Sequence, residues 1–273
     1  MRKILVLIIL LSFLNACSEY QKVYNSEDWE AKYKMAWKMY ENKKYRKADM
    51  LFSQIEHIYK RKPNYQRLLF AHAMSLYHQK YYVSAGEKFR KFTQLFPESS
   101  KTEEADFYIV KSYYNLSPKF SVDQSYTQRA LEEISVFLKK YPFTKYKNEI
   151  NVMNEDLETR LEKKYYEIAL LYYHLERYKA AIRAFNNYFI DYPGSKFKED
   201  ALYYRFKAAA DLAIKSIERK KENRLKTAIE YYNSFIVYAK NDKYKKDAEK
   251  VYTQLQKELS SYNNDELNIS VKN

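Results

Sequence analysis

The clearest architectural signal in the chain is the stretch YKAAIRAFNNYFIDYP, which runs from Tyr178 to Pro193. Tyr178, Ala181 and Phe185 stand at positions i, i+3 and i+7, which lie on one face of a helix. The small alanine lets a neighbouring helix come close, and the rings fill the space on either side of it. Pro193 cannot continue a helix, so the segment ends there. The stretch therefore predicts a helix that packs against a partner along one aromatic face.

The same arrangement of an aromatic residue, an alanine and a second aromatic residue recurs along the chain. Its other copies are Tyr45, Ala48 and Phe52; Tyr82, Ala85 and Phe89; Thr127, Ala130 and Ile134; and Leu225, Ala228 and Tyr232. Upstream of each copy lies a second apolar stripe at helical spacing, for example Phe70, Ala73 and Tyr77, which predicts a partner helix. The copies are more than 34 residues apart, wider than in an uninterrupted tetratricopeptide array, which the pattern otherwise resembles.

Composition supports a purely helical protein. The 273 residues include only 2 Gly and 5 Pro, whereas phosphate-binding loops, dinucleotide folds and β-sandwiches need many glycines. Hydrophobic residues make up 46% of the chain and aromatic residues 18%, which is sufficient for a packed core. We expect an all-α fold, an α-solenoid of about five tetratricopeptide-like helix pairs. A capping helix with Ala248, Val251 and Leu255 on one face closes it at the C-terminal end.

The beginning of the chain has the pattern of an export signal. Arg2 and Lys3 precede an apolar run from Ile4 to Leu14, which is shorter than the roughly 20 residues of a membrane-spanning helix. The run ends in Leu-Asn-Ala-Cys, which resembles a bacterial lipobox, whose cysteine is acylated and becomes the mature N-terminus. Cys17 is the only cysteine, and acylation removes a free thiol from an exported protein. We expect a signal peptide over 1–16 and a covalent lipid on Cys17.

Charge and the residues after Cys17 bear on location. The formal net charge is +14, but an exported lipoprotein meets no nucleic acid. The positive charge therefore points to anionic lipid headgroups or to acidic faces of envelope proteins. Ser18 stands where an aspartate typically retains lipoproteins in the inner membrane, and 18–22 lacks the consecutive acidic residues associated with surface export. We predict the periplasmic face of the outer membrane.

A long stretch without Gly or Pro, from Tyr146 to Tyr173, carries apolar residues at helical spacing and predicts a single long helix. The expected organisation has five parts. They are a signal peptide over 1–16, a lipidated polar tether over 17–26, an N-terminal half with repeats 1 to 3 over 27–145, a long connecting helix with repeats 4 and 5 and the capping helix over 146–262, and a disordered tail over 263–273.

The order of these elements resembles the BamD family, lipoproteins of the outer-membrane β-barrel assembly (BAM) machinery. The likeness covers 28–259. Five stretches carry it: Tyr82 to Pro97 with Glu98-Ser99-Ser100; Asp123-Gln124 before Thr127 and Ala130; Tyr141-Pro142 with Tyr146; Arg160-Leu161 with Lys163; and Tyr178 to Pro193 with Gly194-Ser195. Two features depart from the family pattern. The third repeat lacks its first aromatic residue, and the basic stretch from Lys215 to Lys226 is a longer insert.

The resemblance implies a scaffold that binds the periplasmic domains of the β-barrel protein BamA through its C-terminal half and works with other assembly lipoproteins. Its N-terminal groove would receive C-terminal segments of unfolded outer-membrane proteins. A groove with aromatic and basic side chains suits extended chains that end in an aromatic residue and a carboxylate. The groove candidates are Tyr33, Trp37, Tyr40, Met74 and Tyr77. The BamA-contact candidates are Arg160 and Lys163, from the likeness at the long helix, and Arg183 and Arg205, as exposed basic positions.

An enzyme finds little support in the sequence. The four histidines, His57, His72, His78 and His174, form no H-E-x-x-H motif, and G-x-S-x-G is missing. We expect no catalysis, no metal and no cofactor beyond the lipid on Cys17. Two alternatives to the assembly scaffold stay open. One is a tetratricopeptide lipoprotein adaptor for envelope proteases or peptidoglycan enzymes, and the other is a glycan-binding surface lipoprotein whose tyrosines stack on sugars.

Overall fold

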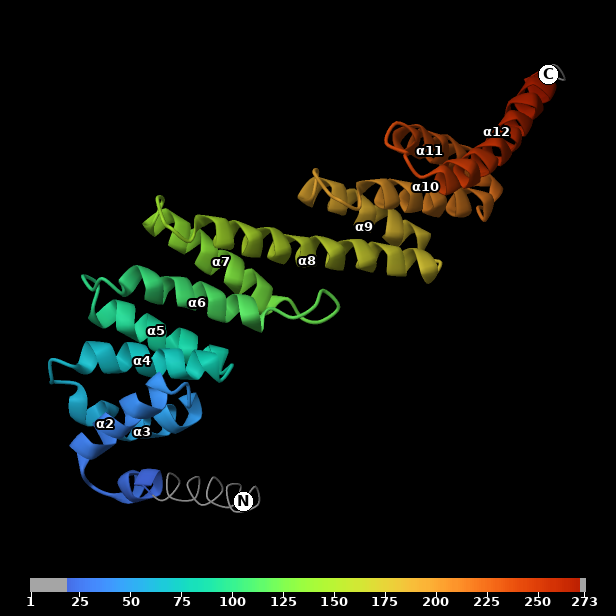
Figure 1. Cartoon of the computed structure of the whole chain (residues 1–273). Coiled ribbons are helices and arrows are strands. Elements are labelled where there is room, and N and C mark those ends of the chain that lie inside the picture. Colours follow the sequence, from blue (N-terminus) through green and yellow to red (C-terminus); the bar gives the residue numbers. More distant parts are fainter. Residues whose placement is uncertain (1–18, 271–273) are drawn as a thin grey trace, which may run out of the picture. The chain divides into compact units, whose positions relative to one another are not determined.

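The chain is built from helices that follow one another in pairs (Figure 1). The computed structural model describes residues 19–270, with side chains as far as residue 262. All regular structure within that range is α-helical. The first three pairs are α2 (Trp29–Glu41) with α3 (Tyr45–Tyr59), α4 (Tyr65–His78) with α5 (Tyr82–Leu95), and α6 (Thr102–Leu116) with α7 (Ser125–Lys140). The next two are α8 (Lys147–His174) with α9 (Tyr178–Asp191) and α10 (Lys198–Ile214) with α11 (Glu218–Ile236). A single helix, α12 (Asp242–Ser270), follows the pairs. The predicted all-α solenoid of helix pairs is confirmed.

The repeated alanine is buried in every pair. The five alanines of the motif have no exposed surface: Ala48, Ala85, Ala130, Ala181 and Ala228. The second aromatic residue of the motif is equally buried at Phe52, Phe89 and Phe185. In the first unit each second helix packs both against its own partner and against the first helix of the next pair, as α3 does with α2 and α4. The motif therefore supplies the contact within a pair and the contact between successive pairs.

Three turns within pairs use the left-handed backbone conformation without glycine. Lys43, Lys80 and Glu176 have φ angles of 56°, 66° and 56°. In the α2–α3 turn the Lys43 amide donates to the Tyr40 carbonyl (2.9 Å) and the Lys44 amide to the Met39 carbonyl (2.8 Å). This hydrogen-bond pair closes the end of the first helix. The turns thereby reverse the chain although glycine is scarce.

The described residues form two compact units, one up to Leu157 and one from Glu158. The boundary falls inside α8, whereas the sequence analysis divides the halves at 145/146, before that helix. The reason is visible in the packing of α8 within each unit. Ile150 and Met153 are buried against α6 and α7, while Tyr166 and Ala169 are buried against α9. The second unit ends with α12, which packs on α10 and α11.

Residues 19–25 are helical, which differs from the polar tether expected over 17–26. Tyr20 is only 6% exposed and belongs to the core of the first unit, with Val23 and Tyr24 packed beside it. The Tyr20 hydroxyl donates to the carbonyl oxygen of Lys47 (3.1 Å). Three apolar side chains at positions i, i+3 and i+4 form one face of a helix, so this segment docks on α3.

At the other end, α12 continues to Ser270, so most of the tail expected to be disordered over 263–273 has a helical backbone. The tail contains no Gly or Pro, and each added residue contributes one backbone hydrogen bond to an existing helix. The predicted signal peptide and the lipid on Cys17 lie outside the described residues. None of the described helices combines the length and the apolar character needed to cross a bilayer.

A polar cluster ties three helices of the first unit together. Glu56 of α3 accepts hydrogen bonds from Lys88 and Lys91 of α5, each at 2.6 Å. Another close neighbour is the buried ring of His72 in α4, whose Nδ1 lies 2.9 Å from a Glu56 oxygen. The second ring nitrogen lies 2.9 Å from Asp49. Burial alone would raise the pKa of Glu56, but its hydrogen bonds to His72 and the two lysines outweigh burial and hold the pKa far below its usual range.

Replacing Glu56 by glutamine should lower the free energy of unfolding of the first unit by about 2–3 kcal/mol, because three buried or half-buried donors lose their anionic partner. Both tryptophans, Trp29 and Trp37, belong to this unit, so their fluorescence during urea titration reports its unfolding. The matched control is Glu132→Gln on the exposed face of α7, which should change stability by less than about 0.5 kcal/mol. Equal losses in both variants would contradict the role of the cluster.

The same cluster predicts a pH dependence. The folded state lowers the pKa of both Glu56 and Asp49, so the unfolded chain binds protons more readily, and acid favours unfolding. This contribution is fully present above the unfolded glutamate pKa of 4.5 and is lost as the pH falls below it. The urea midpoint of the wild type should decrease below pH 4.5, and that of Glu56→Gln should decrease less steeply.

Candidate functional site

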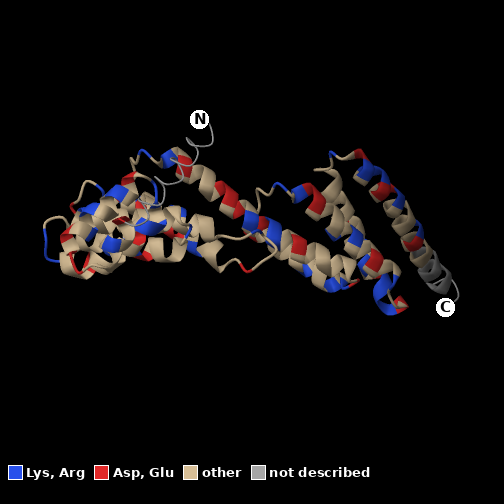
Figure 2. Ribbon diagram, turned by 60° about the horizontal axis from the view of Figure 1, so that its bottom comes forward, with Lys and Arg blue, Asp and Glu red and all other residues tan. Residues whose placement is uncertain are grey.

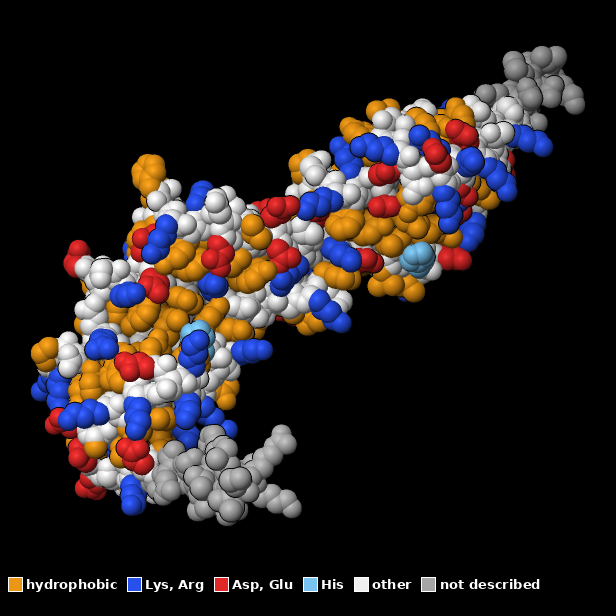
Figure 3. Space-filling model, viewed as in Figure 1, with side chains coloured by type: hydrophobic (Ala, Val, Ile, Leu, Met, Phe, Trp, Pro, Cys, Tyr) orange, Lys and Arg blue, Asp and Glu red, His pale blue; other side chains and the backbone are white. Residues whose placement is uncertain are grey.

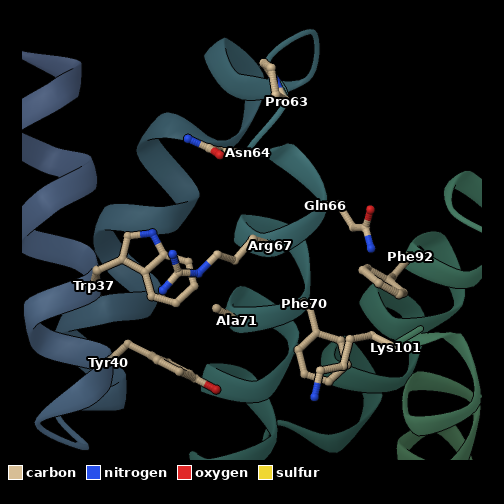
Figure 4. A pocket seen from close by; sticks show the side chains of 10 residues that line it. All are labelled: Trp37, Tyr40, Pro63, Asn64, Gln66, Arg67, Phe70, Ala71, Phe92 and Lys101. Carbon is tan, nitrogen blue, oxygen red and sulfur yellow. The ribbon is translucent and has the colours of Figure 1, made fainter. Parts of the chain in front are cut away.

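A cavity of about 390 Å³ opens in the first unit between α2, α4 and α5 (Figure 4). Successive turns of α2 contribute Trp37 and Tyr40, and α4 contributes Arg67, Phe70 and Ala71. The remaining lining residues are Pro63, Asn64, Gln66, Phe92 and Lys101. We call this space the aromatic cavity. The five groove candidates named from the sequence all lie on α2 or α4, so the cavity opens between the two helices that carry them.

Two cations lie over the rings of the aromatic cavity. The guanidinium carbon of Arg67 is 4.0 Å from the centre of the Trp37 ring system, and the Arg67 side chain reaches over that ring (Figure 4). The Lys101 ammonium is 5.5 Å from the centre of the Phe70 ring. Such cation–π contacts hold a charge next to an apolar surface. The cavity therefore combines an apolar wall with positive charge.

Hydrogen-bond donors also face this region. Burial raises the pKa of the Tyr40 hydroxyl to about 12, so it keeps its proton at neutral pH. The buried Trp37 indole nitrogen has no hydrogen-bond partner. Lys101 is paired with Glu104 (2.7 Å), whereas no carboxylate of the described chain is paired with Arg67. The lining residues themselves include no Asp or Glu. The chemistry that fits is binding of an apolar group that carries a negative charge.

The structure separates the five groove candidates. Trp37 and Tyr40 line the aromatic cavity. Tyr33 stacks on Tyr59 with ring centres 4.8 Å apart and touches the Trp37 ring edge-on. Met74 is only 7% exposed and lies in the core. The Tyr77 ring packs against other tyrosines of the first unit. Of the five, only Trp37 and Tyr40 line the cavity.

Sequence reasoning missed the basic and amide side chains of the cavity, chiefly Arg67 and Lys101. It selected four aromatic residues and Met74, and it assigned Phe70 to the apolar stripe of a partner helix. One signal was available in the sequence: Arg67 precedes Phe70 by three residues, so both lie on the same helical face. A cation beside an aromatic residue on a first helix is the pattern that could have identified the cavity.

The second unit has a different surface. A hollow of about 480 Å³ between α8 and α9 is lined by Tyr172, Lys179, Ala180, Arg183, Ala184 and Asn187. Four large apolar side chains of α8, together with Leu175 directly after the helix, are between 37% and 56% exposed: Tyr165, Ile168, Leu171, Tyr172 and Leu175. We call these five residues the α8 apolar face. Apolar side chains are also visible at the surface of both units in the space-filling view (Figure 3). Exposed apolar patches of this kind mark interaction sites.

The four BamA-contact candidates are all in the second unit. Arg160 and Lys163 are half-buried on α8, and Arg183 is exposed and lines the hollow beside the α8 apolar face. Arg205 is not the exposed position that the sequence suggested. Its guanidinium carbon lies 4.8 Å from the ring centre of Phe189 and 4.2 Å from that of Tyr231. A planar guanidinium stacks on aromatic faces, which explains why the side chain is drawn into the packing of α9, α10 and α11.

Arg205 should therefore be a stability residue, whereas Arg183 should not. Arg205 also donates to the side chain of Asn186 (3.0 Å), and burial lowers the pKa of its guanidinium. Arg205→Gln should lower the free energy of unfolding of the second unit by about 1–3 kcal/mol, seen as faster amide hydrogen exchange in α10 and α11. Arg183→Gln is the matched control and should leave exchange unchanged. Equal exchange rates in the two variants would contradict a role for Arg205 in the packing of the second unit.

The stacked helix pairs place the chain in the class of helical-repeat proteins. The family model described as YfiO, outer membrane lipoprotein, matches residues 26–225. The chain therefore belongs to this family of outer membrane lipoproteins, the BamD family that its sequence resembles. No curated protein sequence matches the chain.

Solved structures give weaker likenesses. The TPR2AB-domain:pHSP90 complex of yeast Sti1 is 14% identical, with a TM-score of 0.41, and the match covers 84% of this chain and 98% of that one. A computationally designed self-assembling cyclic homooligomer is 12% identical, with a TM-score of 0.19 and coverage of 96% of both chains. Neither likeness bears on function.

Proposed function

We propose that the protein is a lipid-anchored scaffold of the BAM machinery on the periplasmic face of the outer membrane. The observation that carries this proposal is membership of the YfiO family over residues 26–225. The lipid on Cys17 supplies the anchor, and the helix pairs hold other polypeptides without a catalytic step. The partners are BamA, other assembly lipoproteins and unfolded outer-membrane proteins.

The aromatic cavity is the proposed receiving site for unfolded substrates. Its volume of about 390 Å³ is at the lower end of the range of ligand pockets, which suits one or two side chains of an extended peptide. Trp37, Tyr40 and Phe70 can surround an aromatic side chain at the end of that peptide. Arg67 can donate two parallel hydrogen bonds to the terminal carboxylate.

This assignment predicts how short peptides bind. A peptide that ends in phenylalanine with a free carboxylate should bind the protein, measured by the fluorescence of Trp37 in a Trp29→Phe background, where it is the only tryptophan left. Arg67→Gln should weaken binding about 10- to 100-fold, because a charge-assisted hydrogen-bond pair is lost. Amidation of the peptide terminus should weaken wild-type binding by a similar factor and have little further effect in Arg67→Gln.

The matched control is Arg61→Gln, which removes an exposed arginine from the loop between α3 and α4 and is not part of the lining of the aromatic cavity. Its peptide affinity should equal that of the wild type. If amidation and Arg67→Gln both left affinity unchanged, the aromatic cavity would not be the carboxylate site.

The α8 apolar face is the proposed contact for BamA. It lies in the C-terminal unit, is rich in exposed apolar area, and borders the basic residue Arg183. Interfaces combine an apolar centre with charged residues at the rim. Of the sequence candidates, Arg183 best fits such a rim, whereas Arg205 supports the packing of the unit from inside.

Placing charge in the α8 apolar face should release BamA. Leu171→Asp, at a position 56% exposed, should reduce the BamA that co-purifies in mild detergent at least tenfold, because an unpaired carboxylate would be buried at the interface. Ile190→Asp on α9, at a position 77% exposed, is the control and should retain BamA. If both variants retained BamA, the α8 apolar face would not be the BamA contact. If the wild type failed to capture BamA, the scaffold assignment would be contradicted.

A further inference from the structure

The N-terminal helix fixes where the chain leaves the first repeat. Tyr20 is inserted into the core of the first unit, and the Lys47 ammonium lies 4.7 Å from the centre of its ring. Glu19 pairs with Lys38 at 3.1 Å. Lys38 is in the last turn of α2, and Lys47 is in the first turn of α3. The two contacts therefore lie on either side of the turn that joins α2 to α3.

That turn carries a dense positive charge. The sequence Lys43-Lys44-Tyr45-Arg46-Lys47 places four cations within five residues, and we call these four cations the basic turn. Lys43, Lys44 and Arg46 are exposed. No carboxylate of the described residues forms an ion pair with them. Lysine and arginine occur along both units (Figure 2), but the basic turn is the cluster beside the docked N-terminal helix.

The distance to the anchor is set by covalent geometry. Cys17 precedes Glu19 by two residues, and two residues span at most about 7 Å. If Cys17 carries lipid, as the proposed function requires, the lipidated residue lies within about 7 Å of Glu19. The docked helix then leaves no slack between the membrane and the first repeat. The basic turn is held at the headgroup layer.

We propose that the basic turn binds the anionic phospholipid surface of the membrane and that the docked helix 19–25 holds it there. The lipid supplies attachment, and the basic turn supplies orientation. A lipid chain combined with a basic patch is a recognised two-part membrane signal. Each cation near an anionic surface contributes about fivefold to affinity, and salt screens the contribution. The first repeat thus lies against the bilayer.

The charge arm of the test uses the mature chain, residues 17–273, produced without the signal peptide and with Cys17→Ser, so that it carries neither the apolar run of 4–14 nor a lipid. It should bind phosphatidylglycerol vesicles, release them at high salt and ignore phosphatidylcholine vesicles. Neutralising Lys43, Lys44 and Arg46 together to glutamine should weaken binding on the order of 100-fold. The matched control neutralises Lys243, Lys246 and Lys250, which are exposed on α12, and should bind like its parent. Equal losses in both triple variants, or binding without a preference for anionic lipid, would overturn the proposal.

The orientation arm uses the lipidated protein in vesicles. Because Cys17 is the only cysteine and its thiol would be acylated, a new cysteine can be labelled selectively. A fluorophore at Asn42→Cys, beside the basic turn, should be quenched by headgroup-linked quenchers, whereas one at Ser135→Cys, exposed on α7 in the third pair of the same unit, should not. Adding Tyr20→Ala should free the helix and reduce quenching at position 42, while the vesicle affinity of the unlipidated chain stays unchanged. Undiminished quenching in Tyr20→Ala would contradict the role of the docked helix.

The two parts of the account fail separately. Mass spectrometry that finds no acyl chain on Cys17 would refute the proposed anchor, whatever the vesicle result. Loss of the preference for anionic vesicles in the Cys17→Ser chain would refute the basic turn, whatever the state of Cys17. Circular dichroism of each triple variant checks that its helices are intact.

Discussion

Close approach of helices at a buried alanine is the constraint on which the rest of the structure depends. Ala48, Ala85 and Ala181 have no exposed surface, and a larger side chain at any of them would push the paired helices apart and open voids around the neighbouring rings. The helix α3, which carries Ala48, packs on both α2 and α4, the two helices that supply most of the lining of the aromatic cavity. Fold and binding surface therefore share one geometric requirement.

Local pattern was sufficient for the fold because the helix pairs repeat a short motif that sequence periodicity reveals directly. Pattern was insufficient where side chains from different helices meet. The contact of Arg67 with the Trp37 ring could not be predicted, because it depends on how α4 and α2 pack. Arg205 was predicted to be exposed because its partners, Phe189 and Tyr231, belong to two other helices. The burial of Tyr20 was not predicted, because the polar composition of its segment suggested a tether.

One kind of contact, a cation over an aromatic ring, serves three purposes in this chain. Lys47 over Tyr20 helps to fix the N-terminal helix, and Arg205 between two rings holds three helices of the second unit together. Arg67 over Trp37 leaves a guanidinium at the edge of an open cavity. The high tyrosine and lysine content of the sequence is thereby used in docking, in packing and in the proposed recognition of substrates.

The left-handed residues in the helix turns carry a consequence for engineering. Lysine or glutamate in this conformation costs about 1 kcal/mol relative to glycine, so the natural chain keeps unrelieved backbone strain at Lys80 and Glu176. Replacing either residue by glycine should therefore increase the free energy of unfolding without altering the aromatic cavity or the α8 apolar face. Lys43 is the exception, because its side chain belongs to the basic turn that is proposed to bind the membrane.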